Sequence, residues 1–123
     1  MKNVLVVEGY PMLLVMWKAA LLGTPINIVG ATTMEEARRG FADNKGELDA
    51  IVINACIASD SGQKASGPNA FELVAEFRKE FKGPMIASSH VPEWREWLMK
   101  AGCNLNATDK IHIPRILKEL LAV

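Results

Sequence analysis

Short apolar runs alternate with longer segments of helical periodicity along the whole of this 123-residue chain. The apolar runs predict strands at residues 4–7, 26–31, 49–53, 85–88 and 103–107. Capping residues and Gly or Pro stops predict helices at residues 11–22, 33–44, 68–81, 93–101 and 114–121. Five strand–helix units with short connections favour a parallel sheet covered on both faces by helices, which is a doubly wound α/β sandwich.

Length and charge narrow the classes of function. We expect one domain spanning 1–123, long enough to bury roughly two-thirds of its unfolded surface without metal or disulfide support. Its 14 basic and 14 acidic residues give a net charge of zero, so no overall field attracts nucleic acid or an anionic membrane. No apolar run approaches the roughly 20 residues of a membrane span, and we expect no signal peptide before the first strand. We therefore expect a cytoplasmic protein that binds neither nucleic acid nor membrane.

Residue types with catalytic chemistry are too scattered to indicate an enzyme. Cys56 and Cys103 have no CxxC spacing and no histidine at zinc-ligand distance, so we predict two reduced, mostly buried thiols and no metal. No serine lies in a nucleophile elbow. After the first strand, Glu8 and Pro11 replace the glycine- or hydroxyl-rich loop that would bind a phosphate group. A hydrolase and a nucleotide- or flavin-binding module are therefore both disfavoured.

Polar residues at the ends of two predicted strands define a candidate site. Ligands of an open parallel sheet bind at the carboxyl ends of its strands. The third strand delivers Asn54 to this edge, and the first delivers Glu8 followed by Gly9. The edge therefore has one certain carboxylate, too few to make a good site for a divalent cation.

Several stretches, taken in order, resemble the receiver domain of bacterial two-component response regulators. They are VLVVE at 4–8, ATTMEEA at 31–37, DAIVI at 49–53, FELV at 71–74 and AGCN at 101–104. The resemblance covers the whole chain and implies the flavodoxin-like fold of chemotaxis regulators, a three-layer sandwich with five helices and a five-stranded parallel sheet in the order 2-1-3-4-5. It also implies a site in which an acidic pair and an aspartate bind Mg²⁺, and the aspartate accepts a phosphoryl group from a histidine kinase.

The chain departs from that pattern where the phosphoryl group would be received. The acceptor position holds Asn54, and the acidic-pair positions hold Glu8 and Gly9. Phosphoryl transfer to a carboxylate needs that carboxylate and cations beside it. We therefore expect a pseudo-receiver that neither binds Mg²⁺ nor is phosphorylated. Asp60 is a conceivable substitute acceptor, but a Ser- and Gly-rich segment at 58–67 is a poor place to preorganise the transfer.

Three further positions implied by the resemblance also differ or stay open. The hydroxyl position matches Ser89, with Ser88 as a register alternative. The lysine position falls on Asp109 when the chain is aligned without a gap, and Lys110 follows one residue later. The aromatic switch position of the fifth strand falls on Asn106, which removes the usual readout of phosphorylation.

If no phosphoryl group is received, a protein-binding surface remains. The resemblance implies that the fourth helix, fifth strand and fifth helix form it. Trp97 beside Arg95 has the composition of a contact hot spot, although a half-buried aromatic is the other interpretation. We predict core positions for Trp17 and for Trp94, Leu98 and Ala101.

The expected function is accordingly a receiver-like signalling module that acts through protein–protein interaction. It is not an enzyme and has no cofactor. Its partner is a histidine kinase, another signalling protein or a second copy of itself. The alternative is a working single-domain response regulator that accepts a phosphoryl group from a histidine kinase.

Overall fold

The computed structural model describes residues 1–60, 65 and 67–123. Five parallel strands form one sheet in the order β2-β1-β3-β4-β5, which confirms the predicted receiver-like α/β architecture. The elements along the chain are β1 (Lys2–Val7), α1 (Pro11–Ala20), β2 (Ile26–Ala31), α2 (Met34–Asp43), β3 (Leu48–Asn54), α3 (Phe71–Arg78), β4 (Met85–Ser88), α4 (Pro92–Ala101), β5 (Leu105–Ala107), the 3₁₀ turn η1 (Lys110–His112) and α5 (Ile113–Leu120).

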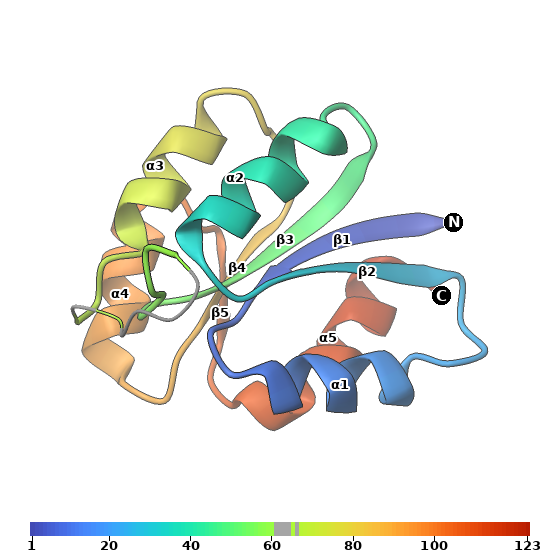
Figure 1. Ribbon diagram of the computed structural model, residues 1–123. Coiled ribbons are helices and arrows are strands. Elements are labelled where there is room, and N and C mark those ends of the chain that lie inside the picture. The colour runs from blue at the N-terminus through green and yellow to red at the C-terminus, as the bar shows by residue number, and fades with distance from the viewer. Residues whose placement is uncertain (61–64, 66) are drawn as a thin grey trace.

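Helices cover both faces of the sheet (Figure 1). Side chains alternate along each strand, so β1 sends Leu5 and Val7 to the face under α2, α3 and α4, and Val4 and Val6 to the face under α1 and α5. Trp17 of α1 is 3% exposed and lies in the core between the sheet and helices α1 and α5, as predicted. Near-continuous apolar strands are what a parallel sheet buried on both faces requires.

Helix α2 begins at a side-chain cap. The hydroxyl of Thr33 accepts a hydrogen bond from the backbone N–H of Glu36 at 3.0 Å. The Glu36 carboxylate instead accepts from the backbone N–H of Thr32 at 2.7 Å and from its hydroxyl at 2.8 Å. These hydrogen bonds stabilise the ionised form and hold the pKa of Glu36 below its usual value.

Helix α3 and strand β5 begin later than predicted because contacts with neighbouring segments use their first predicted residues. Helix α3 begins at Phe71 rather than at 68 or 69. The Asn69 side chain accepts from the backbone N–H of Ile57 at 3.1 Å and donates to its carbonyl at 2.8 Å, which ties this residue to the chain leaving β3. Strand β5 begins at Leu105 rather than at 103, and the N–H of Cys103 instead donates to the Leu98 carbonyl at 3.0 Å at the end of α4.

The connection between β3 and α3 starts against helix α2. The backbone N–H of Met34 donates to the Ala58 carbonyl at 2.8 Å, and that of Glu35 donates to the Ser59 carbonyl at 3.2 Å. Residues 61–64 and 66 of the segment 58–67 lie outside the described residues. Both chain ends lie on the far side of the molecule from this connection (Figure 1). Within the residues that the structure describes, no helix combines the length and apolar character needed to cross a membrane.

Candidate functional site at the carboxyl edge of the sheet

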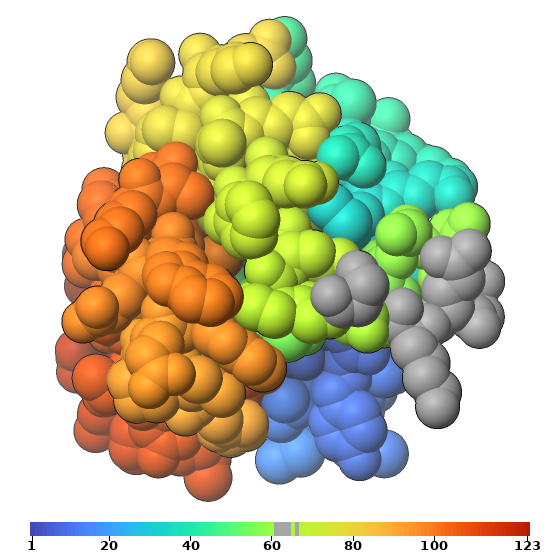
Figure 2. Space-filling model, turned by 90° about the vertical axis from the view of Figure 1, so that its left-hand side faces the viewer, coloured from blue at the N-terminus to red at the C-terminus, as the bar shows by residue number. Residues whose placement is uncertain are grey.

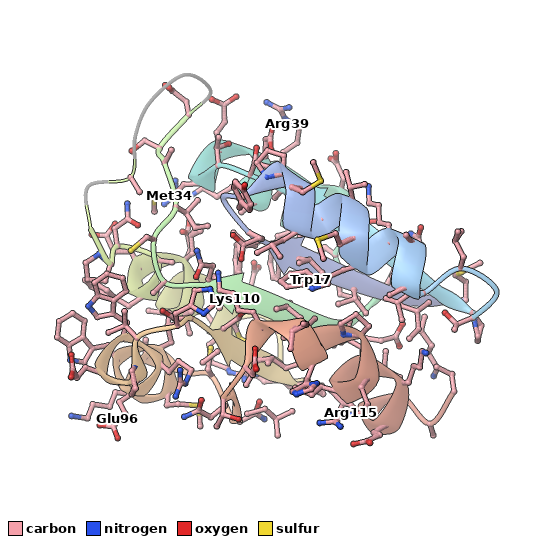
Figure 3. The ribbon with its side chains drawn as sticks, turned by 90° about the horizontal axis from the view of Figure 1, so that it is seen from below. Trp17, Met34, Arg39, Glu96, Lys110 and Arg115 are labelled. Carbon is pink, nitrogen blue, oxygen red and sulfur yellow. The ribbon has the colours of Figure 1, made fainter. Side chains whose placement is uncertain are left out.

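A buried ion pair joins the end of β1 to the turn before α5. Oε1 of Glu8 accepts a hydrogen bond from Nζ of Lys110 at 2.7 Å, and its Oε2 accepts from the backbone N–H of Tyr10 at 3.0 Å. Glu8 is 2% exposed and Lys110 is 6% exposed. Figure 3 shows Lys110 toward the middle of the molecule, in contrast to the outward-pointing Glu96 and Arg115. Both carboxylate oxygens of Glu8 are therefore occupied by donors of this chain.

The short turn η1 decides which of two neighbouring residues reaches this edge. Asp109 is exposed, and its Oδ1 accepts a hydrogen bond from the backbone N–H of Ile111 at 3.0 Å, which caps the turn. The next residue, Lys110, turns inward to Glu8. Of the two alternatives for the lysine position, only Lys110 brings a side chain to the site.

The amide at the end of β3 lies beside a hydroxyl at the end of β4. Asn54 pairs in register with Ser88, and its Nδ2 donates to the Cys56 carbonyl at 3.2 Å. Ser88 is buried, and its Oγ has no hydrogen-bond partner within the described part of the chain. Oγ of Ser89 accepts from the backbone N–H of Val91 at 3.1 Å, so this hydroxyl supports the start of α4.

Arg95 does not form part of an exposed surface, and the expectation that it lies beside Trp97 as a contact residue is wrong. Its guanidinium is buried, with the residue 8% exposed. Nε donates to Oδ1 of Asn106 at 2.7 Å, and Nη1 donates to the Ser89 carbonyl at 2.7 Å. Arg95 therefore connects α4 to the exits of β4 and β5. Asn106, at the aromatic switch position, is exposed and accepts this bond.

The hollow at this edge measures about 350 Å³, but its donors do not fit Mg²⁺. Mg²⁺ requires hard oxygen ligands in octahedral geometry. Here the carboxylate of Glu8 is neutralised by Lys110, Asn54 offers an amide, and Gly9 has no side chain. Across residues 1–60, 65 and 67–123 no three His, Cys, Asp or Glu side chains are grouped to hold a metal. The residues that line this hollow are Glu8, Gly9, Tyr10, Thr32, Asn54, Cys56, Ala58 and Ala65. Asp60, the conceivable substitute acceptor, is not among them.

A second feature is an aromatic surface between helices α3 and α4. Trp97 is 47% exposed and Phe71 is 43% exposed, and with Lys100 and Ala101 they line a shallow, mainly apolar hollow of about 460 Å³. We call these four residues the α3–α4 face; Figure 2 looks onto α3 in yellow-green and α4 in orange. Trp97 thus lies toward α3, whereas the resemblance implied a surface made with β5 and α5.

The outer side of α1 carries a second exposed apolar group that the sequence reasoning missed. Met12, Val15 and Met16 are each more than half exposed. A signal for them exists in the sequence, because Leu14 and Trp17 already supply the buried side of this almost wholly apolar helix. Apolar residues left over on such a helix must face solvent or a partner. We call Met12, Val15 and Met16 the α1 stripe.

No protein-family model matches this sequence, and no curated protein matches it. Among solved structures, the chain is similar to a two-component response regulator from Clostridium difficile, with 18% identity, a TM-score of 0.78, and 99% and 97% of the two chains covered. It is also similar to a Burkholderia pseudomallei response regulator with a phosphorylated aspartic acid and a calcium ion. The identity there is 13% and the TM-score 0.74, with 98% of this chain and 66% of that chain covered. A third similar structure is the receiver domain of a Pseudomonas aeruginosa sensor histidine kinase with a magnesium ion coordinated in its active-site cleft. The identity there is 19% and the TM-score 0.69, with 99% of this chain and 98% of that chain covered. These likenesses show that the chain has the receiver-domain fold.

Proposed function

We propose that this protein is a receiver-like signalling module that binds a protein partner and does not take up a phosphoryl group. The observation that carries the proposal is the Glu8–Lys110 ion pair next to the amide of Asn54. A carboxamide is uncharged and is a poor oxygen nucleophile, so it cannot replace an ionised carboxylate as a phosphoryl acceptor.

The ion pair also opposes the cation that such a reaction needs. A divalent ion approaching Glu8 would have to displace the Lys110 ammonium or lie close to it. Like charges a few ångströms apart repel strongly where little water screens them. The Burkholderia and Pseudomonas structures hold a phosphorylated aspartic acid or a magnesium ion on the same fold. This chain has that fold, and the carboxyl edge of its sheet carries the Glu8–Lys110 ion pair and the amide of Asn54.

Protein binding is favoured by the surface. The α3–α4 face and the α1 stripe leave large apolar side chains in contact with solvent. Contiguous apolar surface of this kind is typical of interaction sites. The proposed partner is a histidine kinase, another signalling protein or a second copy of the chain, and the module is a cytoplasmic, non-enzymatic component of a two-component system.

The test is treatment with a small phosphodonor. We expect the intact mass of the protein to stay unchanged after incubation with acetyl phosphate and Mg²⁺. The matched control is Gly9→Asp with Asn54→Asp, which supplies the missing carboxylates at the same edge. An adduct of one phosphoryl group on the parent chain that requires Mg²⁺ contradicts the proposal and instead supports a working response regulator; peptide mapping then identifies the acceptor.

A further inference from the structure

We infer that the partner of the α3–α4 face is a second copy of this chain. The two copies are related by a two-fold axis, so that their α4 helices pack against each other in antiparallel orientation. This inference rests on the proposed function, because it names the partner that the module binds. The face is exposed and aromatic, and aromatic residues with few charges at the centre are characteristic of protein interfaces.

The charges on α4 are self-complementary about this axis. Glu93, Trp97 and Lys100 are all exposed and lie at positions i, i+4 and i+7, so they form one stripe along the helix. The acidic residue is near the amino end and the basic residue near the carboxyl end. No ion pair within the described residues engages either of them. In an antiparallel pair, Glu93 of one copy would therefore face Lys100 of the other.

The spacing brings the aromatic residue to the axis. Glu93 and Lys100 are seven residues apart, or about 10.5 Å along the helix at 1.5 Å per residue. Their midpoint falls half a residue, less than about 1 Å, from Trp97. A two-fold axis that aligns the charges thus places the two Trp97 side chains beside each other. A closed two-fold interface requires this reciprocal arrangement, in which residue i meets j and j meets i.

The remaining features favour the same occupant. Phe71 and Ala101 flank Trp97 on the side toward α3, and they extend the apolar area beyond a single helix. The chain has a formal net charge of zero, so two copies approach without long-range repulsion. A central tryptophan covered by its symmetry mate, with charges at the rim, has the arrangement of an interaction hot spot.

Sedimentation equilibrium from about 1 μM to about 1 mM protein tests the inference. We expect a monomer–dimer equilibrium in untreated protein. Trp97→Ala should weaken it about 30-fold, as loss of an interface hot spot does. Lys100→Glu and Glu93→Lys should each weaken it about tenfold, because each creates two like-charge contacts. The double variant Glu93→Lys with Lys100→Glu should return to within about twofold of the parent.

The matched control is Lys18→Glu, an identical change at an exposed position of α1. It should leave the dimer unchanged. A monomer at every concentration, failure of the charge swap to restore association, or an equal loss with Lys18→Glu overturns the inference. Far-UV circular dichroism of each variant checks that the fold is retained. The phosphodonor test is independent of this one, since a monomer that stays unphosphorylated removes the two-fold dimer and leaves the proposed function standing.

Discussion

The carboxyl edge of the sheet and the α3–α4 face differ in how their side chains are satisfied. At the edge, Glu8 and Lys110 neutralise each other below the surface, and Arg95 donates hydrogen bonds to two neighbouring oxygens. On the α3–α4 face, Trp97 and Phe71 remain almost half exposed. The charged side chains of the edge are therefore buried and paired within the protein, whereas the aromatic side chains of the α3–α4 face are accessible to a partner. This difference is the basis on which we propose that a partner binds to the helices and that the sheet edge carries no chemistry.

The largest expected effect comes from breaking the buried ion pair. Lys110→Met keeps most of the side-chain length but leaves the Glu8 carboxylate buried without its counterion. We expect a loss of about 3–5 kcal/mol in the free energy of unfolding, measured by urea denaturation. The double variant Glu8→Gln with Lys110→Met should recover much of it, because no charge is then stranded. If Lys110→Met lowers the free energy of unfolding by less than about 1 kcal/mol, the ion pair behaves like one exposed to solvent, and the edge is not sealed from water.

A second prediction tests whether missing carboxylates alone prevent cation binding. A Cβ added at Gly9 would lie 3.4 Å from the Cys56 carbonyl, an ordinary contact, so the backbone there accepts a residue with a side chain. Gly9→Asp with Asn54→Asp should create a millimolar Mg²⁺ site, worth about 4 kcal/mol, that calorimetry detects and the parent lacks. Asn54→Asp alone is the control and should bind more weakly. Equal Mg²⁺ affinity in the parent and the double variant would refute the closed-edge description.

The third prediction separates the two sides of helix α4. Leu98 is 1% exposed and packs in the core under α2, α3 and α4, whereas its neighbour Trp97 is 47% exposed. Leu98→Ala should cost about 2–5 kcal/mol of stability, and Trp97→Ala about 1 kcal/mol or less in monomeric protein. Chemical denaturation at low protein concentration measures both. If Trp97→Ala costs as much as Leu98→Ala, its ring is a core element and not an open contact surface.

Apolar runs and stop signals are local, so the sequence was sufficient to predict the five strands and the helices between them. The order of the strands came only from the resemblance to receiver domains. Strand β4 matches its predicted position, and α4 begins at Pro92, one residue before the predicted start. Side-chain partners were harder, because they depend on residues far apart in the chain. Glu8 and Lys110 are separated by 102 positions, and only the η1 turn determines that Lys110 points inward while Asp109 does not.

Exposure on the helices could be predicted only in part, for a related reason. Apolar periodicity indicates that a helix has a buried face. It does not indicate how wide that buried face is, because the width depends on the elements that pack against the helix. Phe71 continues the spacing of Val74 and Phe77, yet it lies at the first turn of α3 and remains 43% exposed. Arg95 shows the opposite case, a charged residue buried because Ser89 and Asn106 offer oxygens to it.

The smallest expected effect concerns the core directly beneath the α3–α4 face. Cys103 lies in this core next to the end of α4, and burial raises the pKa of its thiol to about 12 from an ordinary value of 9.0. Unfolded chains lose this proton above pH 9 while the folded protein keeps it until about pH 12. The native state therefore binds more protons across this window, so stability must fall as the pH rises through it.

Comparison of the parent with Cys103→Ala isolates this contribution. The stability advantage of the parent should shrink by up to about 1.4 kcal/mol per pH unit above pH 9, measured by urea denaturation at stepped pH values. In the native protein, alkylation should reach the partly exposed Cys56 well before the buried Cys103. Parallel stability curves, or equally fast alkylation of both thiols, would show that solvent enters beneath α4. The exposure of Trp97 and Phe71 would then reflect a loosely packed helix and not a rigid surface presented to a partner.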